Sequence, residues 1–155
     1  MRAMERAERS RLRQRTTTFR TSTLWTGEHT GMLSGEGKQP LTVACPEDFS
    51  AEPGMWTPED MFVAAVEVCH MATFLSYAAK EGVPIASYRS HANGVLEYVD
   101  GDYRFTRIVI FPTITVSSAA VESQVHEILR EAQKHCLVAN SIASIVEVNP
   151  TIMVQ

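Results

Sequence analysis

Hydrophobic and polar positions in the first third of the chain predict three short strands joined by turns. Residues 16–26 are rich in threonine and aromatic side chains, which favour extended backbone. Several glycines then interrupt the pattern, Leu33 begins a second expected strand, and Leu41 to Cys45 form a third. We expect residues 46–56 to form a loop. Together these segments predict a small antiparallel β meander.

A long helix is predicted next, from Pro58 to the residues before Gly82. Thr57 can cap its first turn, and proline suits the first helical position. Apolar side chains recur every three or four residues and polar ones are rare, so we expect a central helix that is buried on most sides. The recurring positions are Phe62, Val66, Cys69, Thr73 and Tyr77.

The next segment predicts a β hairpin of long strands. Residues 87–99 and 103–116 alternate in polarity and flank Asp100 and Gly101, a dipeptide typical of a two-residue hairpin turn. The alternation predicts one face with Ile108, Ile110, Ile114 and Val116, and an opposite face with Phe105, Val109 and Phe111.

The remaining residues predict a second helix over 119–135, capped by Ser117 or Ser118. A short helical piece follows, and a last strand spans residues 145–154. Because no βαβ unit repeats, the fold class is α+β rather than a doubly wound sheet.

Composition and charge narrow the class of protein. The chain has 155 residues, of which 45% are hydrophobic, which is typical of one globular domain. We find neither a secretory signal nor an apolar run near the ~18 residues of a membrane span. Three cysteines do not make a disulfide framework, so we expect a cytoplasmic protein.

Charge is concentrated at the N-terminus. Residues 1–20 hold seven arginines and two glutamates, whereas the remainder is acidic. We expect residues 1–15 to be a disordered basic leader and residues 16–155 to be a single domain. Because the folded part shows no basic stripe, we expect neither a nucleic-acid partner nor a membrane partner.

Two cysteines are candidates for chemistry. Cys69 lies within an apolar helix, where burial would raise its pKa, whereas Cys136 lies at a helix junction whose N-terminal dipole would lower it. Local physics therefore favours Cys136 as the more reactive thiol. Either cysteine can instead be an inert core residue, as we expect for Cys45.

Two motifs resemble those of the OsmC/Ohr family of thiol-dependent hydroperoxide reductases. The first is TPEDMFVAAVEVCH over residues 57–70, with the family's spacing between Glu59 and Cys69. The second surrounds Cys136 and continues as LVANSI, with Leu137 where the family commonly has proline. The order of predicted elements is similar too, and the resemblance covers residues 25–155.

The resemblance implies an OsmC-like α+β fold in an intertwined homodimer. It implies that Cys69 is the peroxidatic thiolate, which attacks an organic hydroperoxide and becomes a sulfenic acid. Cys136 would then resolve it as a disulfide, which an external dithiol or thiol reduces. The resemblance implies no cofactor and no metal.

Glu59 matches the family's glutamate, but it does not share one small site with Cys69 of the same helix. A helix rises about 1.5 Å per residue, which puts the two roughly 15 Å apart along the axis. Glu59 would therefore orient another group, or serve the Cys69 of a neighbouring subunit as the resemblance implies. The structural alternative is an acid that only favours the helix start.

One departure from the family leaves a second function open. Peroxidases of this family carry an arginine in the N-terminal meander, whereas here Glu28 and His29 occupy the matching stretch. Both are candidate substrate-binding residues, and a charged His29 would supply the missing cation. The alternative is a non-peroxidatic member that binds a small molecule or senses redox state.

A third hypothesis is metal binding, with the histidines beside the two cysteines as additional ligands. His70 follows Cys69, and His135 precedes Cys136. Neighbouring residues of a helix point about 100° apart and rarely reach one ion, so we expect no metal site.

Overall fold

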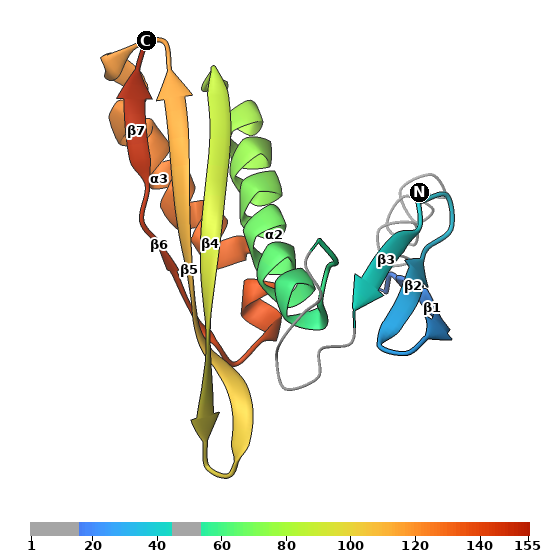
Figure 1. The fold of residues 1–155 in the computed structure, drawn as a ribbon. Coiled ribbons are helices and arrows are strands. Elements are labelled where there is room, and N and C mark those ends of the chain that lie inside the picture. Colours follow the sequence, from blue (N-terminus) through green and yellow to red (C-terminus); the bar gives the residue numbers. More distant parts are fainter. Residues whose placement is uncertain (1–15, 45–53) are drawn as a thin grey trace, which may run out of the picture. The chain divides into compact units, whose positions relative to one another are not determined.

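The computed structural model describes residues 16–44 and 54–155, which divide into two units between Thr57 and Pro58 (Figure 1). Each unit is described by itself. The predicted leader over residues 1–15, Cys45 and most of the predicted loop lie outside the described residues. The single domain over residues 16–155 stays a prediction.

The N-terminal unit contains the predicted meander. Its strands are β1 (Ser22–Gly27), β2 (Thr30–Ser34) and β3 (Leu41–Ala44), paired antiparallel in that order. The first strand begins later than expected, at Ser22. Glu28 has a left-handed φ of 47° in the turn between β1 and β2, and its carbonyl accepts a hydrogen bond from Trp25 Nε1.

The C-terminal unit places helices against one sheet, which confirms the α+β class. The sheet has the order β4-β5-β6, with β7 also paired to β5, and both short strands run parallel to β5. Its elements in chain order are α2 (Pro58–Lys80), β4 (Ser87–Val99), β5 (Asp102–Val116), η1 (Ala119–Val121), α3 (Glu122–His135), η2 (Ala139–Ser141), β6 (Ile145–Val148) and β7 (Thr151–Val154).

The predictions of the hairpin and of the last strand had different outcomes. The hairpin is confirmed, because Asp100 and Gly101 have the positive φ values, 55° and 90°, that a two-residue hairpin turn needs. The single last strand is wrong, because β6 and β7 are separated at Asn149 and Pro150. Proline has no N–H for a strand ladder, while Asn149 donates to the Ile110 carbonyl at 2.8 Å.

Only one stripe of α2 is buried, so the prediction of burial on most sides is wrong for the described chain. The buried stripe is Val66, His70, Phe74 and Ala78, whereas Val68 on the other side is 56% exposed. Burial follows the helix face that meets the sheet. The largest core cluster joins α2, β5 and α3 through Phe74, Ala78, Val83, Ile114, Val116, Val125, Ile128, Leu129 and Ala132.

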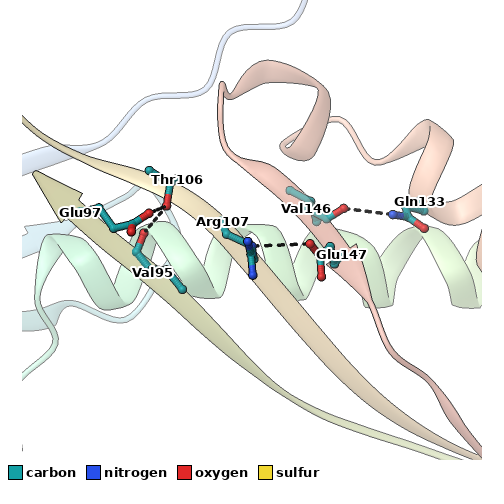
Figure 2. A network of polar contacts seen from close by, with 7 residues as sticks. All are labelled: Val95, Glu97, Thr106, Arg107, Gln133, Val146 and Glu147. Atoms are coloured by element: carbon teal, nitrogen blue, oxygen red, sulfur yellow. Dashed lines mark hydrogen bonds and ion pairs between the residues drawn. The ribbon is translucent and has the colours of Figure 1, made fainter. Parts of the chain in front are cut away.

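A β-bulge corrects the predicted face of Phe105. The register of β4 and β5 shifts between Val95 and Leu96, and Thr106 is the extra residue. Its hydroxyl donates to the Glu97 carboxylate and lies 3.5 Å from the Val95 carbonyl (Figure 2). The shift turns Phe105 towards α2, where its ring stacks on Phe62 with centroids 4.8 Å apart.

Polar contacts attach β6 to its neighbours (Figure 2). Arg107 Nε of β5 lies 3.6 Å from Glu147 Oε1, and Gln133 Nε2 of α3 donates to the Val146 carbonyl at 3.1 Å. The segment between α3 and β6, which contains Cys136 and η2, is therefore anchored on both sides.

His70 makes stability depend on pH. It is 1% exposed, and neither ring nitrogen has a hydrogen-bond partner among the described residues. Burial lowers the pKa of His70, so below its ordinary value of about 6.5 the unfolded chain binds more protons than the folded one. We expect the stability to be complete above that pH and to fall below it, by no more than about 1.4 kcal/mol per pH unit.

Chemical denaturation of the wild type and of His70→Leu at pH 7.5 and 5.5 measures this contribution. The wild type should lose more stability on acidification than the variant, because leucine does not titrate. Equal losses in the two proteins would contradict the prediction.

Candidate active site

The structure brings Cys69 and Cys136 together. Cys69 lies half-buried near the middle of α2, and Cys136 directly follows α3 with 1% of its surface exposed. Both are free thiols, and their sulfurs are hydrogen-bond partners of each other. The pairing that the family resemblance implied is therefore geometrically available.

Backbone hydrogen bonds from the residues after α3 affect the pKa of both thiols. The N–H groups of Leu137 and Val138 donate to Cys69, and those of Val138 and Ala139 donate to Cys136. Cys136 has extended backbone (φ −68°, ψ 110°), so the chain turns sharply there before η2 begins. The turn presents amide protons to a pair of sulfurs.

The pKa values of the two thiols shift in opposite directions. Burial raises the pKa of Cys69, but hydrogen bonds from Val138, Cys136, Thr73 and Leu137 outweigh burial and lower it below the ordinary value. The Cys69 thiolate therefore forms more readily than that of an ordinary cysteine.

The predicted order of the two pKa values is reversed. Burial and the neighbouring Cys69 raise the pKa of Cys136 to about 11, against the opposing amides of Ala139 and Val138. The helical turn that follows Cys136 does favour its anion, as expected. It is outweighed because the thiol is buried beside a second sulfur, which local sequence does not reveal.

Thr73 is a contributor that sequence reasoning placed only among apolar positions. Its hydroxyl donates to the Cys69 carbonyl at 2.8 Å and is also a hydrogen-bond partner of the Cys69 sulfur. The available signal was the spacing of four residues, which stacks two side chains on one helix face. The amides of Leu137 and Val138 had no such signal, because every residue except proline carries an N–H.

The other sequence candidates lie apart from this pair or in the other unit. Glu59 is half-buried in the first turn of α2, on the same helix as Cys69. Glu28 and His29 are exposed in the turn between β1 and β2 of the N-terminal unit. The structure thus unites the two cysteines and leaves the roles of these three residues as predictions.

The histidines beside the cysteines point elsewhere. His70 lies in the buried stripe of α2, while the ring of His135 stacks on Tyr77 and lies 3.4 Å from a Glu131 oxygen. Across residues 16–44 and 54–155, no group of three His, Cys, Asp or Glu side chains is placed to hold a metal ion.

Comparison with known proteins identifies the family. Residues 51–151 match the family model described as OsmC-like protein. The chain belongs to the OsmC-like family. The match spans both cysteines, Glu59, and the whole of α2 and α3. No protein of curated function matches the sequence at a significant level.

Solved OsmC-like structures share the fold at low sequence identity. An OsmC-like protein of unknown function from Vibrio cholerae has a TM-score of 0.79 and 24% identity, over 87% of this chain and 99% of its own. An organic hydroperoxide resistance protein from Elizabethkingia anophelis has a TM-score of 0.70 and 15% identity, over 92% of this chain and 99% of its own. An organic hydroperoxide resistance protein from Legionella pneumophila has a TM-score of 0.66 and 16% identity, over 91% of this chain and 100% of its own.

Family membership also decides how α2 is understood. The sequence prediction that no apolar run is long enough to span a membrane is wrong. By length and composition alone, the helix Pro58–Lys80 is long and apolar enough to do so. OsmC-like proteins are soluble, and Val66, Phe74 and Ala78 of α2 pack in the core of this unit. We therefore treat α2 as a core helix.

Proposed function

We propose that this OsmC-like protein reduces organic hydroperoxides with Cys69 and Cys136. The observation that carries the proposal is the asymmetry of the pair. The pKa of Cys69 is lowered, while that of Cys136, which is in hydrogen-bond contact with it, is raised to about 11, so Cys136 keeps its proton at neutral pH. A peroxidase of this kind needs one nucleophilic sulfur and one neutral thiol waiting beside it.

The chemistry follows from that asymmetry. The Cys69 thiolate attacks the outer peroxide oxygen, the O–O bond breaks, and the leaving alkoxide takes a proton to become an alcohol. Cys69 is then a sulfenic acid. The Cys136 sulfur displaces its hydroxyl, forming a disulfide, and the Cys136 proton leaves with the hydroxyl as water. An external dithiol returns both sulfurs to thiols and becomes a disulfide itself; we propose that this takes place in the cytoplasm.

The names of similar structures support the substrate class. The proteins from Elizabethkingia anophelis and Legionella pneumophila are called organic hydroperoxide resistance proteins. Apolar side chains near Cys69 would suit an organic hydroperoxide. Phe62 and Val63 lie on α2 one to two turns before Cys69, and Val138 packs in the same cluster.

We further propose a homodimer, supported by the outer face of α2. A stripe with the three- and four-residue spacing of paired helices is exposed on it: Ala65, Val68, Ala72, Leu75 and Ala79. An exposed apolar surface of this kind on a soluble protein indicates an interface with another molecule. A second copy supplies a matching stripe, and sedimentation would show twice the mass of one chain.

In that dimer we assign Glu59 to the neighbouring subunit's Cys69, since helix geometry separates it from its own. Glu28 and His29 are assigned to substrate binding from the meander. These assignments rest on the family resemblance.

Stopped-flow oxidation of the reduced protein, followed by peptide mass spectrometry, tests the proposed function. We expect an organic hydroperoxide to oxidise the protein faster than hydrogen peroxide does, with a Cys69–Cys136 disulfide as product. Oxidation no faster than that of a free thiol would reject the peroxidase. That result would favour the alternative, a small-molecule-binding or redox-sensing member of the family.

A further inference from the structure

Asn140 connects the end of α3 to the turn that carries Cys136. Its side-chain Nδ2 donates to the Lys134 carbonyl at 3.0 Å, and its main-chain N–H donates to the Cys136 carbonyl at 3.0 Å. Carbonyls in the last turn of a helix lack a partner within that helix, and the Asn140 amide supplies one for Lys134. One residue therefore holds the chain both before Cys136 and at Cys136 itself.

The helix no longer fixes Cys136, which directly follows it with extended backbone (φ −68°, ψ 110°). The turn after Cys136 contains the short helix η2, and Ser141 stabilises this turn from within. The Ser141 N–H donates to the Val138 carbonyl at 3.0 Å, and its Oγ donates to the Leu137 carbonyl at 2.8 Å. The bonds of Ser141 stay inside the turn, whereas the side chain of Asn140 reaches back to α3.

The same turn packs near the part of α2 that carries Cys69. Val138 and Ala139 pack against the core cluster that contains Val66, which lies three residues before Cys69. Cys136 is 1% exposed, so its side chain has little room to change position. A disulfide forms only within narrow limits, with the two Cα atoms about 4.4–6.8 Å apart. The main-chain position of Cys136 therefore decides how readily its sulfur reaches that of Cys69.

We propose that Asn140 is a positioning residue for disulfide formation, and that its two hydrogen bonds hold Cys136 where its sulfur meets the oxidised Cys69. In this step the S–S bond forms, the S–O bond of the Cys69 sulfenic acid breaks, and the Cys136 proton leaves with the hydroxyl as water. Asn140 acts through the main chain of Cys136, so the preceding attack on the peroxide does not depend on it. The catalytic meaning of this role rests on the proposed function, whereas the alignment of the two thiols does not.

Asn140→Ala and Ser141→Ala form a matched pair of variants. Both residues are exposed, and each substitution removes one hydrogen bond from a side chain to a carbonyl while keeping the main-chain N–H. Asn140→Ala releases the turn from α3, whereas Ser141→Ala loosens the turn and leaves its connection to α3. A general loss of rigidity would affect both variants, and a loss of positioning would affect Asn140→Ala alone. Circular dichroism verifies that both variants fold.

The first experiment mixes the reduced protein with an organic hydroperoxide and follows each oxidation state of Cys69 by mass spectrometry with a sulfenic-acid trap. We expect Asn140→Ala to form the sulfenic acid at the wild-type rate and the disulfide roughly fivefold more slowly, the effect of one hydrogen bond. More Cys69 should then reach the sulfinic acid. Ser141→Ala should follow the wild type in both steps. Equal slowing of the disulfide step in both variants, no slowing in either, or equal slowing of both steps in Asn140→Ala would overturn the proposal.

A second experiment uses no peroxide. Glutathione disulfide oxidises the two thiols to the same disulfide and is reduced to two molecules of glutathione, so the equilibrium constant measures how well the thiols are aligned. This constant should fall roughly fivefold in Asn140→Ala and keep its wild-type value in Ser141→Ala. Equal constants in the three proteins would overturn the positioning role. If the constant falls as expected while hydroperoxide oxidation of the wild type is slow, the proposed function fails and the positioning role stands.

Discussion

Replacing Cys69 with serine is expected to slow hydroperoxide consumption by about a thousandfold or more, the scale of losing a nucleophile. Serine is close in shape to cysteine, but its hydroxyl stays protonated at neutral pH and is a far weaker nucleophile than a thiolate. Substrate consumption under stopped flow, with circular dichroism to verify folding, measures the effect. A variant that consumed hydroperoxide at the wild-type rate would refute the assignment of Cys69.

Cys136→Ser is the matched control, because its hydroxyl keeps a donor beside Cys69. We expect the first oxidation to proceed within a few-fold of the wild-type rate. No internal disulfide can form, so mass spectrometry should show Cys69 gaining one and then further oxygen atoms while turnover stops. The opposite pattern, with Cys136 required for the first oxidation and Cys69 not, would exchange the two roles.

Gly94→Ala is expected to lower the free energy of unfolding by about 2 kcal/mol, the usual scale of overpacking. A Cβ at this position would collide with the Val63 side chain of α2 and would lie 2.9 Å from Cε1 of Phe105. Neither neighbour yields easily. Valine is stiff at χ1, and the Phe105 ring is stacked on Phe62.

Urea denaturation at one fixed protein concentration measures this change, with Asn93→Ala as the control on the same strand. Asn93 is exposed and points to the other face of the sheet, so its replacement should change stability by less than about 0.5 kcal/mol. Similar losses in the two variants would show that α2 and β4 do not meet closely at Gly94.

Local sequence signals located most elements of the C-terminal unit. Pro58 marked the start of α2, and the Asp100-Gly101 pair marked the hairpin, because each residue type meets a backbone requirement that its own position imposes. Ser118 likewise accepts from the Ala120 N–H at the start of η1.

The failures have a common cause in tertiary contacts. The bulge at Thr106 leaves no turn signal, yet it reverses the face of Phe105. The burial of Cys136 depends on how α2 and α3 meet, and it reverses the expected order of the two thiols. Periodicity also could not separate the buried and exposed faces of α2, because both carry apolar residues.

The main-chain donors to Cys69 have a consequence for how ionic strength acts on the protein. An ion pair between exposed side chains weakens as salt is added, since mobile ions screen charges beyond about 10 Å at 0.1 M. Backbone amides carry no net charge for mobile ions to screen. Added salt should therefore disturb the ionisation of this thiol less than it would disturb that of a thiol beside an exposed lysine or arginine.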